Sequence, residues 1–155
     1  MKFPLSKLFA VVVVASIIAM AARNHINSPE RKIRLAGVNY QPDRKGGRFL
    51  TLPDGAEWND EKLAEIVEIA ADFDQPHAIG IVGGSVTDDG FKVFTNASNI
   101  FSIFVMDSNV SEAIFDTLVD MPDLKHLTIT NCPNIGQSEI HEFRLANPKI
   151  DVQPF

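Results

Sequence analysis

The sequence predicts an α/β fold in which one strand–helix unit is repeated along the chain. The first observation is a recurring pattern, clearest when residues 100–123 are placed above residues 124–149. Each stretch begins with apolar residues at positions 1, 4 and 6, continues through a polar turn, and ends in apolar residues at helical spacing. The second observation is a shared spacing, in which apolar residues follow at offsets 5, 8 and 11 from Trp58, Val86, Val110 and Ile135. Units of about 24 to 29 residues that join one short strand to one helix are typical of repeat proteins.

The same pattern predicts where each strand and helix lies. Apolar alternation predicts strands near residues 50–52, 79–81, 103–105 and 127–129. Helices are expected to begin near Asp60, Asp88, Glu112 and Ser138. In these positions a polar side chain satisfies free backbone N–H groups and an acid complements the helix dipole. Asp88, Asp89 and Glu112 are therefore interpreted as capping residues, because no loop has the ligand spacing of a calcium site. Ile150 and Val152 predict a last short strand that closes the stack.

Residues 1–22 are predicted to be a signal peptide or a membrane anchor. Lys2 and Lys7 precede about 15 apolar residues, fewer than the roughly 20 that a spanning helix usually needs. Small residues around Met20 offer a cleavage site, whereas Arg23 and the bases of residues 31–34 oppose export. Cleavage and retention both stay open, and a mitochondrial-type presequence is a weaker third alternative. The chain is accordingly expected to be exported or membrane-anchored.

Residues 23–47 are predicted to be a linker and an N-terminal cap. Ile33, Leu35, Val38 and Tyr40 alternate in two short phases, which is compatible with a capping strand. The polar stretch 41–46 ends in Gly-Gly and is expected to be a flexible turn. The repeat domain then spans residues 48–155.

Composition excludes several classes of function. A chain of 155 residues with 45% apolar and 22% charged residues is long enough for one soluble domain with its own core. Residues 24–155 hold 11 basic and 20 acidic groups, a net charge of −9, which disfavours a nucleic-acid or anionic-membrane surface. The single cysteine, Cys132, excludes an internal disulfide and a CxxC site.

No catalytic or metal-binding motif is present in the sequence. His141-Glu142 lacks the second histidine of a zinc-protease helix, and Gly83-Gly84-Ser85 is better explained as a strand-to-turn corner than as a phosphate loop. His77 and His126 are expected to be solvated, and Cys132 to be an inert small residue. The sequence therefore predicts no enzyme, no metal, no cofactor and no small-molecule substrate.

The stretch LKHLTITNCPNIGQSEI, residues 124–140, resembles the leucine-rich repeat family. Its Asn-Cys turn followed by an aliphatic residue is most similar to the short, cysteine-containing subtype, and the resemblance covers roughly residues 49–152. It implies a short solenoid with a parallel sheet on the concave face and helices on the convex face. It also implies that Asn131 or Cys132 hydrogen-bonds to the neighbouring turn, with an incomplete ladder at Gly84 and Ser108. Members of this family are overwhelmingly binding modules.

Side chains that alternate away from the core on the strands are the candidate binding residues. Phe104 and Met106 are informative, because the repeat does not need these positions to be apolar and exposed apolar patches usually mark interaction sites. The predicted binding residues are Phe104, Met106, Val82, Ser102, His126 and Thr128. One alternative stays open, in which residues 33–46 fold back over these side chains.

The sequence thus predicts a non-catalytic module that binds a protein partner through its concave sheet. A second hypothesis is an accessory or assembly subunit of a larger membrane protein complex, in which the repeat edge and the basic segment 31–34 are buried. No nucleic-acid partner is expected, and the N-terminal segment is expected to meet a membrane.

Overall fold

The computed structural model of the chain describes residues 5–26, 28–42, 48–53, 56–95 and 97–154, with the backbone alone for residues 5–11, 22, 24–26, 42 and 154. Its helices are α1 (Leu5–Ile26), α2 (Pro29–Leu35), α3 (Asp60–Ala71), α4 (Asp88–Phe91), α5 (Ile114–Val119) and α6 (Gln137–Ala146). A short 3₁₀ helix, η1 (Lys92–Phe94), follows α4. Its strands are β1 (Asn39–Pro42), β2 (Arg48–Thr51), β3 (His77–Val82), β4 (Ile100–Met106), β5 (His126–Thr130) and β6 (Asp151–Pro154).

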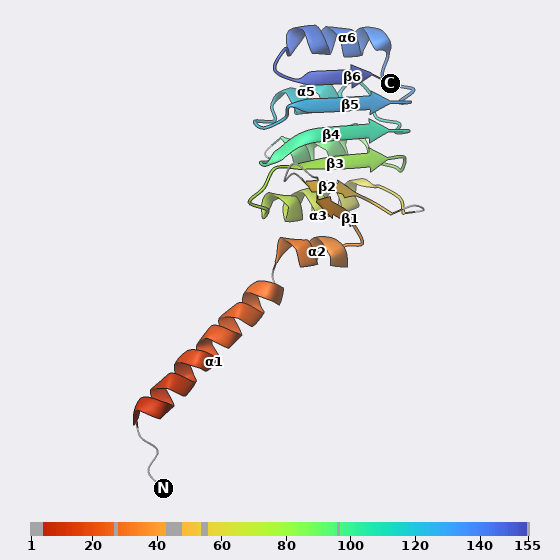
Figure 1. The fold of residues 1–155 in the computed structure, drawn as a ribbon. Coiled ribbons are helices and arrows are strands. Elements are labelled where there is room, and N and C mark those ends of the chain that lie inside the picture. The colour runs from red at the N-terminus through yellow and green to blue at the C-terminus, as the bar shows by residue number, and fades with distance from the viewer. Residues whose placement is uncertain (1–4, 27, 43–47, 54–55, 96, 155) are drawn as a thin grey trace.

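The strands form one sheet in chain order, from β1 to β6 (Figure 1). Strands β2 to β6 run parallel, and β1 joins the end of the sheet antiparallel to β2. The expected strands all appear, including the closing strand β6. The predicted α/β fold with a mostly parallel sheet is therefore confirmed.

The core lies between one face of the sheet and the helices. Inward residues of neighbouring strands pair in register, as Ile79 does with Ile103 and Ile103 with Leu127, and all three are fully buried. The residues from which the helical spacing is counted, Trp58, Val86, Val110 and Ile135, are buried as well. Ala146 is exposed although the spacing points it inward. It lies in α6, and in the described chain no further helix follows to cover it.

Three of the expected helix starts are confirmed and one is shifted. α3 begins at Asp60 and α4 at Asp88, with the side chains of Asn59 and Thr87 accepting hydrogen bonds from backbone N–H groups of the first turn. α5 begins only at Ile114, because residues 111–113 form a turn first. α6 begins at Gln137, next to the expected Ser138, but Ser138 is not its cap: Gly136 precedes the helix, and the Ser138 hydroxyl donates to Glu139.

Each parallel strand in the middle of the sheet ends in the same kind of turn. The residue after β3, β4 or β5 has a positive φ, and these residues are Gly83, Asp107 and Asn131. Glycine, aspartate and asparagine are the residue types that tolerate this conformation best. Gly84 also has a positive φ, which agrees with the expected strand-to-turn corner.

The N-terminal cap differs from the predicted capping strand. Ile33 and Leu35 lie in α2, because Ser28 caps the helix and Pro29 begins it, and both residues favour a helix start. Ile33 is fully buried in the core, whereas Leu35 is 77% exposed. The extended segment begins later, with β1 at Asn39.

Helix α1 points away from the sheet (Figure 1). Its described apolar side chains are exposed: Val12, Val13, Val14, Ile17, Ile18 and Met20. Within the described residues, no helix has the length and apolar character to cross a bilayer. Residues 1–4 of the predicted signal or anchor segment lie outside the described residues, so that assignment stays a prediction.

Candidate functional site

The parallel register places the outward side chains of the sheet in rows that run across the strands. One row is Phe49, Ala78, Ser102, His126 and Asp151. The next row is Thr51, Gly80, Phe104, Thr128 and Gln153. A third row is Val82, Met106 and Thr130.

Small residues between large ones hollow out this face. Ala78, Gly80 and Ser102 have little or no side chain, and the rings of Phe49 and Phe104 stand beside them. The Phe49 ring lies over Gly80 so closely that a Cβ there would meet the ring at 2.8 Å. Phe49 and Phe104 contact each other edge to face, with ring centroids 5.4 Å apart. A side chain at position 80 would therefore displace the Phe49 ring from this place.

A β-bulge adds a third ring to the hollow. His77 pairs with Ile100 and Ala78 pairs with Ser102, so Phe101 is an extra residue in β4 with no partner on β3. Such an extra residue re-aims the side chains beside it. The ring of Phe101 lies edge-on to the imidazole of His126, with centroids 6.2 Å apart.

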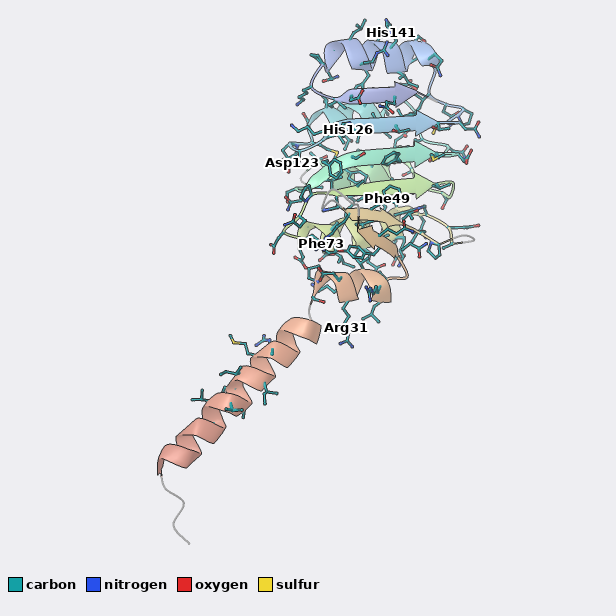
Figure 2. All side chains as sticks on the ribbon, in the orientation of Figure 1. Arg31, Phe49, Phe73, Asp123, His126 and His141 are labelled. Carbon is teal, nitrogen blue, oxygen red and sulfur yellow. The ribbon has the colours of Figure 1, made fainter. Side chains whose placement is uncertain are left out.

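Together these residues line a groove of about 630 Å³ on the outward face of the sheet. Phe49, Phe101 and Phe104 form its apolar part, over Ala78 and Ser102. Polar side chains complete the lining: Gln41, Arg48, His126, Thr128, Asp151 and Gln153. Figure 2 shows Phe49 and His126 on the strands from which they reach this face. A groove of this size with an apolar centre and polar edges can accept a side chain or a short peptide segment.

The two ends of the groove have different electrostatics. At one end, the Arg48 guanidinium donates to Glu30 at 2.8 Å and lies 4.9 Å from the centroid of the Phe73 ring. That hydrogen bond is the main reason that the pKa of Glu30 is lowered. At the other end, His126 Nδ1 lies 3.4 Å from Asp151 Oδ2, and both side chains are more than half exposed. Arg48 is thus held in place, whereas His126 and Asp151 face solvent.

Comparisons with known proteins add a likeness of fold. No family model matches this chain, and no curated protein matches its sequence. Among solved structures, the chain is similar to one described as leiomodin-1 actin-binding site 2, with a TM-score of 0.55 and 12% sequence identity. That match covers 84% of this chain and 79% of the other. At this identity the likeness supports the fold alone.

The structure brings four of the six predicted binding residues together. Phe104, Ser102, His126 and Thr128 line the groove, although Ser102 is only 3% exposed and contributes to its floor. Val82 and Met106 pair in the third row, outside the groove lining, where Val82 is 47% exposed.

Seven residues of the groove lining were not among the predicted binding residues: Gln41, Arg48, Phe49, Ala78, Phe101, Asp151 and Gln153. The sequence carries no specific signal for Phe101, because the same apolar spacing of three residues recurs from Leu124 to Leu127, where the register shows no bulge. Asp151 and Gln153 belong to the closing strand, whose pairing with β5 only the register shows.

Residues 33–42 do not fold back over the outward side chains of the sheet, as the alternative interpretation expected. Ile33 and Val38 pack in the core, and β1 extends the sheet beside β2. Of this described stretch, Gln41 is the residue that lines the groove. Residues 43–46 lie outside the described residues.

His77 differs from the expectation of a solvated side chain. It is fully buried at the start of β3, with Nδ1 3.1 Å from the carbonyl oxygen of Gln75. Its Nε2 has no hydrogen-bond partner among the described residues. Burial lowers the pKa of His77, because the interior disfavours the charged imidazolium. His126 is exposed, as expected.

Neither Cys132 nor any cluster of potential metal ligands in the described residues offers a reactive site. Cys132 is buried, its pKa is raised by burial, and its Sγ lies 3.8 Å from the carbonyl oxygen of Val105. The described residues contain no group of three or more histidine, cysteine or acidic side chains arranged to hold a metal ion. A protonated, buried thiol is a poor nucleophile.

Proposed function

We propose that this chain is a non-catalytic protein-binding module of the leucine-rich repeat type that binds its partner through the outward, concave face of the sheet. The single observation that carries the proposal is the groove of about 630 Å³, with three phenylalanine rings at its centre and polar side chains around them. Protein interfaces combine an apolar centre rich in aromatic residues with a polar rim. The three rings are half-buried on this face and do not belong to the core cluster.

Contacts that recur from unit to unit support the repeat assignment. The Asp60 carboxylate accepts hydrogen bonds from the backbone N–H and the hydroxyl of Thr87, at 2.8 and 2.7 Å. The Asp88 carboxylate accepts the same two bonds from Ser111, both at 2.7 Å. In each case the first acid of one helix accepts hydrogen bonds from a residue that shortly precedes the helix of the next unit. Such neighbour-to-neighbour contacts are what a stack of similar units requires.

The turns after the strands also connect along the stack. The Gly83 N–H donates to the Met106 carbonyl and the Asp107 N–H donates to the Thr130 carbonyl, at 2.7 and 3.1 Å. The Asn131 side chain donates to Asp107. The buried Ser108 hydroxyl has no partner among the described residues, which agrees with a ladder that is incomplete at that position.

The nature of the partner follows from charge and from the N-terminus. The net charge of −9 for residues 24–155 makes a protein a better partner than a nucleic acid. The exposed apolar side chains of α1 favour a chain that is exported after removal of residues 1–22 or is anchored by them. The actin-binding site named for the leiomodin-1 chain is not carried over to this protein, because the likeness is at 12% identity.

A second candidate function is that of an accessory or assembly subunit in a larger membrane protein complex. The observation that favours it is the exposed side of α2, where Arg31, Arg34 and the 77% exposed Leu35 lie close in the chain to α1. A partner subunit at a membrane could cover this surface. Crosslinking from position 35 would then capture that subunit, whereas crosslinking from position 104 would capture the partner of the groove.

The test of the main proposal uses the full-length chain in nanodiscs of phosphatidylcholine and a phage-displayed library of random dodecapeptides. Selected peptides should bind wild type, and Phe104→Ser should weaken their binding by about 2 kcal/mol, or about 30-fold in Kd. Leu145→Ser is the matched control, since Leu145 is 67% exposed on α6 and does not line the groove. Equal binding by wild type and Phe104→Ser, or no selected peptide, would overturn the proposal.

A further inference from the structure

A second hollow, of about 640 Å³, lies at the edge of the sheet where β5 and β6 begin. Its lining includes the cations Lys125, Arg144 and Lys149, together with His126 and Asp151. Within the described residues, none of the three cations lies within 4 Å of a carboxylate oxygen. In a folded region with 20 acidic and 11 basic groups, three cations without a carboxylate partner around one hollow are a local reversal of charge, although Arg144 also contacts His141 Nδ1 at 3.1 Å.

Helix and strand structure explain only part of this cluster. Arg144 lies in the last turn of α6, where the helix dipole favours a cation. Lys125 belongs to no helix, and its carbonyl oxygen accepts a hydrogen bond from the N–H of Asp151 at 2.8 Å. The backbone pairing thus fixes the start of β5 against the start of β6 and brings the two lysines to the same edge.

The cationic hollow adjoins the aromatic groove. His126 and Asp151 line both, so the two hollows meet at these side chains. Asp151, the acid at this junction, already accepts a hydrogen bond from Gln153 and lies 3.4 Å from His126. The combined surface therefore runs from three phenylalanine rings to three cations without a carboxylate partner.

We propose that the partner presents a segment with an aromatic or aliphatic anchor followed or preceded by acidic residues. The anchor sits among Phe49, Phe101 and Phe104, and the carboxylates lie along Lys125, Arg144 and Lys149. This inference rests on the proposed protein-binding function and adds the chemistry of the partner to it. Complementary charge at the rim chiefly raises the association rate and makes it dependent on salt.

The same peptide selection tests the inference when its sequences are read for charge. Peptides selected by wild type should combine an apolar anchor with at least two acidic residues. The double variant Lys125→Glu with Lys149→Glu should bind them about tenfold or more weakly at low salt, and 0.5 M NaCl should remove most of that difference. The matched control is Arg31→Glu with Arg34→Glu, since both arginines are exposed at the opposite end of the sheet domain.

The possible failures can be told apart. Peptides that depend on Phe104 but carry no excess of acids, or that bind the lysine double variant as well as wild type, overturn this inference and leave the proposed function standing. If no peptide depends on Phe104, the proposed function fails and this inference with it. Binding to vesicles that contain phosphatidylserine, lost in the lysine double variant and without acidic peptides, would overturn the inference in favour of a lipid surface.

Discussion

Gly90 occupies a position where the space for a side chain is already filled. A Cβ there would collide with Oδ1 of Asp60, the same carboxylate that accepts two hydrogen bonds from Thr87. The glycine in α4 is thus linked to a contact between two successive units. The absence of a side chain at Gly90 lets α4 approach the start of α3.

The variant Gly90→Ala is expected to displace the Asp60 carboxylate and to weaken both of its bonds to Thr87. We expect the free energy of unfolding to fall by about 1 to 3 kcal/mol. Urea denaturation of the full-length chain measures the change, with Ser98→Ala in an exposed turn as the control. An unchanged midpoint for Gly90→Ala would mean that the carboxylate contact contributes nothing to stability.

His77 makes stability depend on pH. Burial lowers its pKa in the folded state, so near the ordinary histidine value of about 6.5 the unfolded chain binds more protons than the folded one. The contribution of His77 is fully present above that value, and we expect the free energy of unfolding to decrease as pH falls from about 7 to 5. The positive charge of Arg48 also lowers the pKa of His77, whereas the hydrogen bond to the Gln75 carbonyl opposes the shift.

His77→Leu should flatten the dependence of unfolding on pH between 5 and 7, whatever its effect on stability at pH 7. Chemical denaturation at a series of pH values measures it. A wild-type profile that is already flat over this range would contradict the assigned burial of His77.

The strands contribute to stability through their inward residues. Ile103 and Leu127 are fully buried neighbours on β4 and β5, and truncation of buried aliphatic side chains leaves a cavity. Ile103→Ala and Leu127→Ala are each expected to lower the free energy of unfolding by about 2 to 5 kcal/mol. Thr128→Ala, at the next position of β5 on the outward face, is the control and should stay within about 0.5 kcal/mol.

This experiment tests the register of the sheet, that is, which side chains of β5 point inward. If Thr128→Ala destabilised the protein more than Leu127→Ala, the inward and outward faces of β5 would be interchanged. Hydrogen exchange adds a local readout, because units in such a stack contact mainly their neighbours. Protection should be lost first in β5, α6 and β6 for Leu127→Ala.

In the N-terminal cap, two sequence signals predict different types of secondary structure for the same residues. The alternation of Ile33, Leu35, Val38 and Tyr40 favours a strand, but Ser28 and Pro29 begin a helix that includes the first two. The capping signal marks where a helix begins. Here it outweighs the apolar alternation, which is too short to distinguish a strand from a helix. The strand signal holds only from Asn39 onward, where β2 supplies a partner.

At the scale of the whole molecule, residues 1–22 are expected to make the chain partition with membranes. A signal peptide would be removed, because the small residues before Ala22 offer a cleavage site, whereas an anchor would be kept. Mass spectrometry of the mature N-terminus distinguishes the two: a start at Ala22 indicates cleavage, and retention of Lys2 indicates an anchor. A chain that starts at residue 24 should lose membrane association. Recovery of intact chain in the soluble fraction would contradict both alternatives.

The sequence by itself determined the α/β class, the positions of the strands along the chain and most of the inward residues. These follow from local periodicity, which any chain segment shows before it has partners. The tertiary structure alone decided the bulge at Phe101, the burial of His77 and the joining of two hollows at His126. Each depends on which strand lies alongside and in what register. A one-residue shift in pairing changes which face a side chain takes, so the composition of a face built across five strands is a property of the assembled sheet.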